Sequence, residues 1–313
     1  MHFYDYHSLN DVSGLIQEAL KIRDQNLYSK IGSGKTMALI FLNPSLRTRI
    51  STQQAAYRLG MNVICFNSNE AWPWEISPHA IMDKNKSEHI KDAAKVISSY
   101  VDLIGIRCFA GLEDKTQDQA DIMIKEFMKY ATVPVINMES AVYHPMQSLT
   151  DIVTIESTKK VELPRITLSW APHPKALPHA VANSFTQWVI NRGYPLTITH
   201  PPGYELDPNI TTGATINYNQ DEALADSDYV YVKNWCMGEP YGKNPDILHD
   251  WTISTDKMKL TNNAYFMHCL PIRRNVVASD EVLDGEKSLI HSQAQNRMYA
   301  AQAVISRILT SMK

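Results

Sequence analysis

Short apolar runs alternate with amphipathic stretches along the 313-residue chain. The runs have the length of buried strands, and strands are expected at 37–42, 62–66, 101–106, 133–137, 165–170, 196–200, 229–233 and 264–268. The stretches between them repeat apolar residues at helical spacing, and helices are expected at 12–20, 48–59, 88–99, 117–130, after 145, and at 177–191 and 293–312. This alternation predicts an α/β protein with mainly parallel sheets.

The alternation of expected strands and helices is interrupted near residues 145–160 and then begins again. A chain of this length exceeds one average domain. We therefore expect two α/β domains with a hinge in that interval.

The composition is that of an ordinary soluble globular protein, with 44% hydrophobic and 20% charged residues. The net charge of −3 gives no general reason to expect nucleic acid or an acidic membrane as a partner. No apolar run could span a bilayer, and the first residues, MHFYDYHSLND, do not have the pattern of a signal peptide. Four scattered cysteines without a C-x-x-C pair argue against a zinc site or a disulfide framework. We expect a cytoplasmic protein.

The stretch Gly34-Lys35-Thr36 looks like part of a phosphate-binding P-loop. A P-loop needs a further glycine five residues earlier, where this chain has Ser29, and it follows a strand instead of preceding one. We therefore expect a polar turn that leads into the strand 37–42, and a P-loop kinase is a weak alternative.

The segment Ser45-Leu46-Arg47-Thr48-Arg49 follows that strand and begins a helix. The backbone N–H groups and the dipole at a helix N-terminus favour anions, and two arginines with two hydroxyls can clamp a phosphate. Open α/β sheets also bind their ligands at the carboxyl ends of parallel strands. On these residues alone, a capped helix start with surface arginines remains the alternative.

Four segments in order resemble the motifs of the aspartate/ornithine carbamoyltransferase family. They are Ser45–Arg49, Arg107 at the end of the third strand, His144-Pro145-Met146-Gln147, and His268-Cys269-Leu270-Pro271. The resemblance extends over nearly the whole chain. It implies that a neutral amine attacks the carbamoyl carbon of carbamoyl phosphate and that phosphate leaves.

The resemblance also implies the roles of individual residues in carbamoyl-phosphate binding. The carbonyl oxygen would be polarised by Arg47, Thr48 and His144. The phosphate would be held by Ser45, Arg49 and Arg107, and Gln147 would orient the carbamoyl NH₂. Leu46 and Leu270 complete these segments, and the Leu270–Pro271 bond is expected to be cis. Holding two small substrates together supplies much of the remaining rate enhancement, so no metal or cofactor is expected.

The second domain departs from the common ornithine enzyme. That enzyme has D-x-W-x-S-M-G, whereas this chain has Lys233-Asn234-Trp235-Cys236-Met237-Gly238. A lysine in place of the aspartate would repel the free α-ammonium of ornithine. The α-nitrogen of the substrate is therefore expected to be acylated, which disfavours ornithine and putrescine as substrates.

The pattern as a whole resembles the acylornithine branch of the family. It implies two doubly wound parallel-sheet α/β domains, with carbamoyl phosphate bound by residues 1–147 and acylornithine by residues 148–292. The C-terminal helix, 293–313, would pack back on the first domain. The acylornithine would be bound by Phe109, Glu139, His173, Asn183, Lys233, Cys269, Leu270, Arg274 and Ser87. Cys269 and Arg274 are also candidate catalytic residues, although Cys269 has an alternative as a small buried hydrophobe.

Two further expectations follow from the branch. Trp72 would reach the carbamoyl-phosphate site of a neighbouring subunit, which implies a homotrimer. Ser87 occupies the position that discriminates between acyl groups, where a glutamate would repel a succinyl carboxylate. With Lys84 and Lys86 nearby, this favours N-succinyl-L-ornithine, a substrate of arginine biosynthesis, over N-acetyl-L-ornithine. A non-catalytic carbamoyl-phosphate-binding homologue is the alternative of another class.

Overall fold

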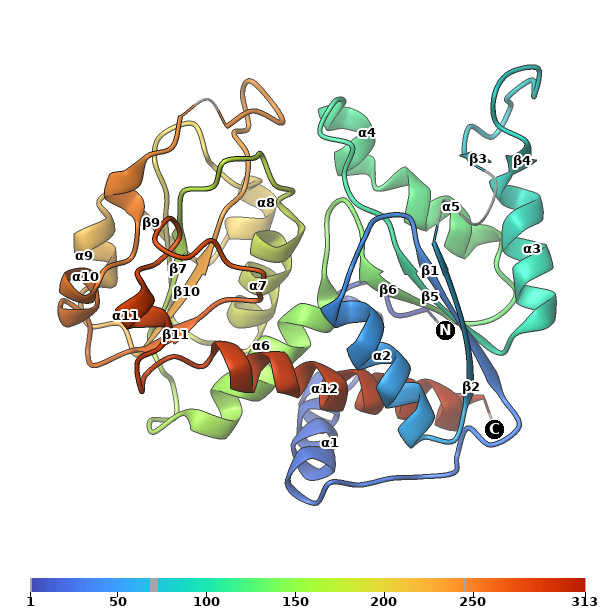
Figure 1. Ribbon diagram of the computed structural model, residues 1–313, viewed down its shortest axis with the longest axis horizontal. Helices are drawn as coiled ribbons and strands as arrows, with labels where there is room; N and C mark the ends of the chain where they lie inside the picture. Colours follow the sequence, from blue (N-terminus) through green and yellow to red (C-terminus); the bar gives the residue numbers. More distant parts are fainter. Residues whose placement is uncertain (1, 68–72, 245, 313) are drawn as a thin grey trace. The chain divides into compact units, whose positions relative to one another are not determined.

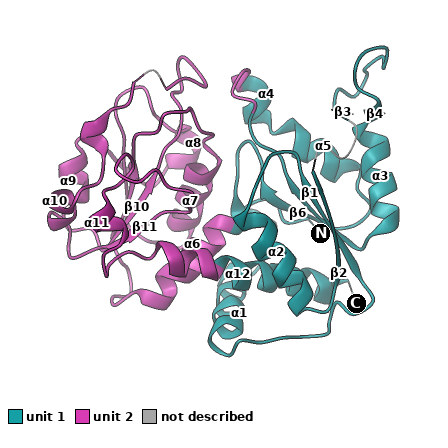
Figure 2. Cartoon of the chain, viewed as in Figure 1, with its two compact units in different colours: residues 1–110, 116–146, 297–313 teal, residues 111–115, 147–296 magenta. Residues whose placement is uncertain are grey.

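The computed structural model describes residues 2–67, 73–244 and 246–312, and the chain divides into two compact units (Figures 1 and 2). Unit 1 comprises residues 1–110, 116–146 and 297–313, and unit 2 comprises residues 111–115 and 147–296. Two long helices have residues in both units. They are α6 (Pro145–Thr158) and α12 (Ile290–Ser311), and the short helix α4 (Lys115–Ala120) also begins in unit 2 with Lys115.

Unit 1 contains a four-stranded parallel sheet in the order β2-β1-β5-β6. Its strands are β1 (Thr36–Phe41), β2 (Asn62–Asn67), β5 (Leu103–Arg107) and β6 (Val135–Glu139). A second, two-stranded sheet pairs β3 (Trp74–Glu75) with β4 (Glu88–His89). The helical elements are η1 (Tyr6–Ser8), α1 (Val12–Asp24), α2 (Arg47–Arg58), α3 (Ile90–Tyr100), α4 (Lys115–Ala120) and α5 (Ile122–Tyr130).

Helices cover both faces of the unit 1 sheet (Figure 1). Helices α3 and α5 bury Ile40, Ile104 and Ile106, and Phe127 of α5 stacks on Trp74 with 5.5 Å between ring centroids. On the other face lie α1, α2 and the unit 1 part of α12. Because both faces are covered, the central strand β1 is apolar along nearly its whole length.

Unit 2 contains a five-stranded parallel sheet in the order β11-β10-β7-β8-β9. Its strands are β7 (Ile166–Trp170), β8 (Leu196–Thr199), β9 (Thr215–Asn217), β10 (Tyr229–Lys233) and β11 (Tyr265–Met267). The helical elements are α7 (Ala180–Asn191), α8 (Pro208–Thr211), α9 (Gln220–Leu224), η3 (His249–Trp251), α10 (Thr255–Lys259) and α11 (Asp280–Leu283). Its core includes Val230, Val232 and Phe266.

The expected doubly wound α/β architecture is confirmed, and so is the reading of Gly34-Lys35-Thr36 as a turn. Gly34 has φ +78°, strand β1 begins at Thr36, and the Lys35 Nζ lies 3.2 Å from an Asp102 carboxylate oxygen. The Leu270–Pro271 bond is cis, as expected. Within the described ranges, no helix combines the length and the apolar character needed to cross a membrane.

One expected element is wrong: the helix 117–130 is interrupted at Asp121, which has φ +54°. The Asp121 carboxylate accepts hydrogen bonds from the Tyr4 hydroxyl at 2.8 Å, the Ser140 hydroxyl at 2.6 Å and the Ala141 N–H at 3.1 Å. These contacts hold the loop after β6, and they override the helical periodicity.

Candidate active site

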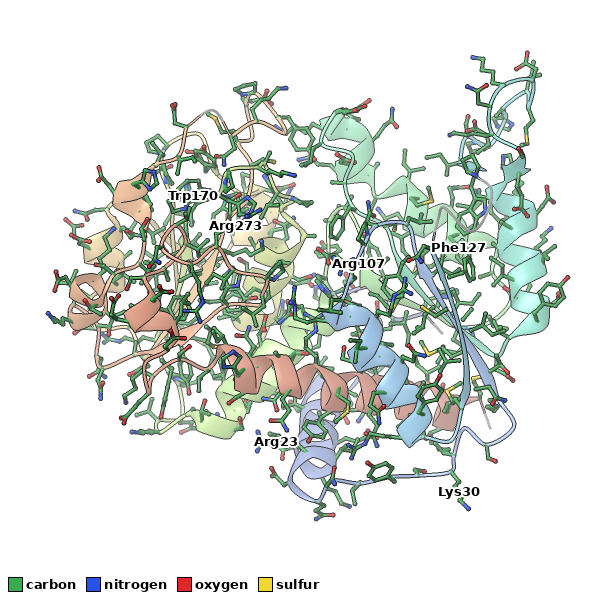
Figure 3. The ribbon with its side chains drawn as sticks, in the orientation of Figure 1. Arg23, Lys30, Arg107, Phe127, Trp170 and Arg273 are labelled. Atoms are coloured by element: carbon green, nitrogen blue, oxygen red, sulfur yellow. The ribbon has the colours of Figure 1, made fainter. Side chains whose placement is uncertain are left out.

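In unit 1, three neighbouring strands end in one row. The register pairs Phe41 of β1 with Arg107 of β5, and Arg107 with Glu139 of β6. Because parallel strands present their carboxyl ends on the same edge, the residues at and just after these positions converge. The edge carries Arg107 and Glu139, and the segment 43–49 follows directly after β1 (Figure 3 labels Arg107).

Arg107 is the centre of a buried group of charges. Its Nη1 lies 2.8 Å from a Glu139 carboxylate oxygen and donates a hydrogen bond to the Thr48 hydroxyl at 2.9 Å. The same Glu139 oxygen lies 3.2 Å from the His144 Nε2. Sequence reasoning placed Glu139 against acylornithine, whereas here it joins two residues expected to bind carbamoyl phosphate. A buried ion pair of this kind fixes geometry more than it stabilises the fold.

Helix α2 begins at Arg47 with Leu46 as its N-cap, and no side chain among the described residues caps it. The first N–H groups of a helix lack intrahelical acceptors and favour an anion. Arg49 is held in this first turn by a hydrogen bond to the Asn67 side chain and lies over the Phe41 ring, 4.7 Å from its centroid. The helix start is thus suited to a phosphate.

Arg297 of α12 belongs to this group, and sequence reasoning missed it. Its Nη2 donates to the Thr48 hydroxyl at 2.6 Å, and the residue is buried. Thr48 therefore accepts hydrogen bonds from two guanidinium groups. The signal in the sequence was an arginine at helical spacing from the apolar residues Ala301, Val304 and Ile308.

Phe109 is expected to pack along the substrate. In the structure its ring packs against the guanidinium group of Arg107. The Arg107 guanidinium lies 4.3 Å from the centroid of the Phe109 ring, and the Phe109 N–H donates to the Asn43 side chain at 2.7 Å. The aromatic face shields one side of the charge, which strengthens its interactions on the other.

The loop that carries Ser87 is anchored at both ends. Strands β3 and β4 flank it, and the His89 Nε2 lies 2.9 Å from the Ser77 carbonyl oxygen. Ser87 is exposed, and the Lys86 Nζ lies 3.5 Å from a Glu75 carboxylate oxygen. Trp72, expected at a subunit interface, lies outside the described residues.

In unit 2, the strands β11, β10 and β7 also end in one row. Lys233 at the end of β10 pairs in register with Trp170 at the end of β7. His173 follows β7, and Cys269 and Leu270 follow β11. Asn183 is buried in the first turn of α7. The topology therefore places four of the expected acylornithine-binding residues at the ends of three adjacent strands.

His173 lies near the two cations Lys233 and Arg273, and we call these three residues the cationic group. Burial lowers the pKa of His173, and the nearby charges of Lys233 and Arg273 lower it further. Among the described residues, neither Lys233 nor Arg273 has a carboxylate within ion-pair distance. The His173 Nδ1 is 2.8 Å from the Lys175 carbonyl oxygen, which fixes the ring. Figure 3 labels Arg273.

Arg274 was expected to bind the acylornithine, but in the structure it forms ion pairs with Asp280 and Asp284. Its guanidinium donates to Asp280 at 2.7 Å and to both carboxylate oxygens of Asp284 at 2.9 Å and 2.7 Å. These carboxylates raise the pKa of Arg274 further above its ordinary value. Sequence reasoning chose Arg274 from two adjacent arginines, whereas Arg273 is the one that belongs to the cationic group.

The segment after β11 has an unusual backbone. Leu270 has φ +54°, a conformation that bulky residues rarely adopt. The Leu270 N–H donates to the His268 Nδ1 at 2.8 Å, which stabilises this turn. The Cys269 thiol is buried. Non-glycine residues with positive φ are concentrated at functional sites, where surrounding contacts maintain the strain.

Gln147 lies in the first turn of α6, directly after His144-Pro145-Met146. It is buried, and its Nε2 donates to the Asp151 carboxyl group at 2.6 Å. Its amide is therefore fixed by a neighbour on the same helix.

Comparisons with known proteins agree with this geometry. Residues 2–157 match the family model described as aspartate/ornithine carbamoyltransferase, carbamoyl-P binding domain, and residues 178–308 match its Asp/Orn binding domain. An N-succinylornithine carbamoyltransferase of Bacteroides fragilis is 42% identical over 97% of each chain. An N-acetylornithine carbamoyltransferase of Xylella fastidiosa is 36% identical over 96% of this chain and 95% of the relative.

A solved structure is also similar along nearly the whole chain. It is that of an N-acetyl-L-ornithine transcarbamylase mutant complexed with carbamyl phosphate and N-succinyl-L-norvaline. The TM-score is 0.93 at 33% sequence identity, and the match covers 98% of this chain and 99% of the other.

Proposed function

The chain belongs to the aspartate/ornithine carbamoyltransferase family and is an enzyme of this class, and we propose that it acts on N-succinyl-L-ornithine. It would transfer the carbamoyl group of carbamoyl phosphate to the δ-amine, giving N-succinyl-L-citrulline and phosphate, in arginine biosynthesis. The observation that carries this proposal is the cationic group of unit 2, to which no described carboxylate is paired.

Unit 1 is assigned to carbamoyl phosphate. The phosphate would be held by Ser45, Arg49, Arg107 and the N–H groups at the start of α2, with Arg297 added through its contact with Thr48. Arg47, Thr48 and His144 would stabilise the negative charge that develops on the carbonyl oxygen as the amine attacks. The C–O bond to phosphate then breaks, and the attacking nitrogen loses a proton.

Unit 2 is assigned to the acylated amino acid. A free α-ammonium beside Lys233 and Arg273 would be repelled, whereas an amide nitrogen would not. N-succinyl-L-ornithine has two carboxylates and no α-ammonium, which matches two cations without a described acidic partner. We infer that Arg273 takes the substrate-binding and catalytic role that the sequence suggested for Arg274. His173, Asn183, Cys269 and Leu270 would complete the site.

Two observations favour succinyl over acetyl. The identity to the N-succinylornithine enzyme is 42%, against 36% for the N-acetylornithine enzyme. The loop that contains Ser87 presents Lys84 and has no carboxylate at position 87, while Lys86 in the same loop lies near Glu75. A succinyl tail carries a negative charge, so such a loop attracts it more than an acetyl group.

The test is a ureido-product assay with carbamoyl phosphate and, separately, N-succinylornithine, N-acetylornithine and ornithine. We expect the highest kcat/KM with N-succinylornithine and no significant turnover of ornithine. Higher turnover of N-acetylornithine would overturn the acyl-group assignment alone. Turnover of ornithine would overturn the role given to Lys233.

We also propose that the enzyme is a homotrimer in which Trp72 crosses the interface. Apolar side chains are exposed along α2 and β2, where Leu46, Ile50, Tyr57 and Ile64 are each at least 49% exposed. Exposed apolar side chains that gather in one region are typical of an interaction surface. Light scattering should give three chain masses. Mixing dissociated Trp72→Ala and Arg107→Leu chains should restore activity, because hybrid trimers contain intact shared sites, and no recovery would contradict the sharing.

A further inference from the structure

Asp121 of unit 1 binds the connection between β6 and α6, which consists of residues 140–144. The Asp121 Oδ1 accepts the Ala141 N–H at 3.1 Å. The Oδ2 accepts the Ser140 hydroxyl at 2.6 Å. The carboxyl group therefore binds the first two residues of the connection, one with each of its oxygens.

Hydrogen bonds within the turn 140–143 fix its shape. The Ser140 N–H donates to the Tyr143 carbonyl oxygen at 2.8 Å, and the Tyr143 N–H donates to the Ser140 Oγ at 3.2 Å. The Asn137 Nδ2 also donates to this Oγ, at 3.2 Å. A serine hydroxyl has one proton and two acceptor positions. With both acceptor positions used, the proton is directed to the Asp121 oxygen at 2.6 Å, since the Tyr143 carbonyl oxygen is 3.4 Å away.

The turn lies between two members of the buried group of charges. Glu139 precedes it and His144 follows it, and a Glu139 carboxylate oxygen lies 3.2 Å from the His144 Nε2. Glu139 is fixed because it is the last residue of β6 and pairs with Arg107. On the other side, Pro145 restricts the backbone of His144, the residue before it. The turn therefore determines where the His144 ring lies relative to Glu139.

Asp121 is itself held in place. It is buried, and its φ of +54° lies in the left-handed region, which surrounding contacts must maintain. One of these contacts is the Tyr4 hydroxyl, which donates to the Oδ2 at 2.8 Å. Burial, followed by the charge of Asp121, raises the pKa of Tyr4, so the phenol keeps its proton and remains a donor. Because this bond is separate from the two that reach the turn, it can be removed alone.

We propose that Asp121 is a positioning residue that holds the turn 140–143 and thereby places the His144 ring against the carbamoyl oxygen of carbamoyl phosphate. The inference rests on the proposed function, which gives His144 that contact. A displacement of about 1 Å near the reacting atoms can lower a rate roughly a hundredfold. Arg49 and Arg107, which would hold the phosphate, lie outside the turn. Loss of Asp121 should therefore lower kcat and leave the KM for carbamoyl phosphate nearly unchanged.

The experiment measures kcat, the KM for carbamoyl phosphate and urea unfolding, with the amine that gives the highest turnover in the ureido-product assay. Asp121→Ala removes the acceptor that holds the turn and should lower kcat between about tenfold and a hundredfold. Asp121→Asn keeps a carbonyl oxygen for the Ala141 N–H, so it should recover part of this loss. The KM for carbamoyl phosphate should stay near the wild-type value in both variants.

Tyr4→Phe and Ser140→Ala form a matched pair. Each removes one hydroxyl that donates to the Asp121 Oδ2, but only Ser140 belongs to the turn. Ser140→Ala should lower kcat several-fold. Tyr4→Phe keeps the ring and its edge-on contact with Tyr143, at 5.4 Å between centroids, so it should lose stability and keep the wild-type kcat. A role of Asp121 in folding alone would affect kcat alike in the two variants.

The outcomes separate this inference from the proposed function. If the wild-type enzyme forms no ureido product with any of the three amines, the proposed function fails, and the role of Asp121 fails with it. If the wild-type enzyme turns over but Asp121→Ala keeps its kcat, or Tyr4→Phe loses as much kcat as Ser140→Ala, the role of Asp121 alone is overturned. The matched pair decides the question if Asp121→Ala does not fold.

Discussion

The two units have parallel sheets of the same design, but the charges at their strand ends differ. In unit 1, Arg107 is paired with Glu139 and bonded to Thr48, and His144 contacts the same carboxylate. In unit 2, Lys233 and Arg273 lie near His173 without an ion-paired carboxylate among the described residues. The comparison teaches that the unit 1 group is held in shape by its own opposite charges, whereas in the unit 2 group we propose that the substrate supplies the negative charge.

The largest effect is expected from breaking the paired group. Arg107→Leu should lower kcat/KM for carbamoyl phosphate at least a hundredfold and the free energy of unfolding by about 3 kcal/mol, because Glu139 is left buried without its partner. Steady-state kinetics and urea unfolding measure the two effects. The double variant Arg107→Leu/Glu139→Leu should recover much of the stability but none of the activity. Unchanged stability in the single variant would contradict the coupling.

Mutations in the cationic group should affect substrate binding and leave the stability of the fold nearly unchanged. Lys233→Ala and Arg273→Ala should each raise the KM for the acylated ornithine at least about tenfold, the value of a hydrogen bond between charged groups. The KM for carbamoyl phosphate and the free energy of unfolding should change little, because no described ion pair is lost.

Arg274→Ala is the natural control for that experiment, since it removes the adjacent arginine. Its ion pairs with Asp280 and Asp284 are exposed, and exposed pairs contribute little. We expect a nearly wild-type KM. A larger effect in Arg274→Ala than in Arg273→Ala would return the substrate contact to Arg274.

A smaller effect is expected at position 87. Ser87→Glu would place a negative charge near the succinyl tail, and about 1 kcal/mol of repulsion in a solvated loop corresponds to roughly fivefold. The ratio of kcat/KM for N-succinylornithine to that for N-acetylornithine should fall accordingly. Ser87→Gln has the same size without the charge and should leave the ratio unchanged, and an equal fall in both variants would mean that size matters instead.

The smallest effect concerns the pH dependence of stability. Burial lowers the pKa values of His173, His179 and His200 in unit 2, and of His2 in unit 1, below the ordinary 6.5. The unfolded chain therefore binds more protons than the folded one just below pH 6.5, and stability falls as the pH falls through this window. Burial raises the pKa of Asp121 in unit 1, so protonation there has the opposite sign.

His200→Phe tests this contribution. His200 is buried edge-on against Trp235, with 6.3 Å between ring centroids, and its Nδ1 lies 2.9 Å from the Pro201 carbonyl oxygen. Urea unfolding followed by tryptophan fluorescence at several pH values should show a weaker loss of stability below pH 6.5 in the variant. An unchanged slope would exclude His200 as a source of the acid sensitivity.

Much of the fold could be predicted because parallel strands buried on both faces are continuous apolar runs. The same topology brings strand ends together, so Arg107, His173, Lys233 and Cys269 could be chosen before the structure was known. The short strand β9 was missed because two of its three residues are exposed, which leaves no apolar run to recognise.

Other features depend on contacts that a sequence pattern does not contain. The break at Asp121 follows from hydrogen bonds to residues 4, 140 and 141, which are distant or lie beyond the helix. The choice between Arg273 and Arg274 depends on which side chain meets Asp280 and Asp284. Arg297 lies within a helix whose periodicity indicates packing and not ligand binding.

The hydrogen bond between Thr48 and Arg297 spans 249 positions of the sequence. A ribosome synthesises the chain from its N-terminus, so β1 and the start of α2 emerge long before α12. Until α12 has left the exit tunnel, Thr48 lacks one of its two guanidinium partners, and the phosphate site that we propose for unit 1 lacks the contact of Arg297 with Thr48. We therefore expect a nascent chain to bind phosphate tightly only late in its synthesis.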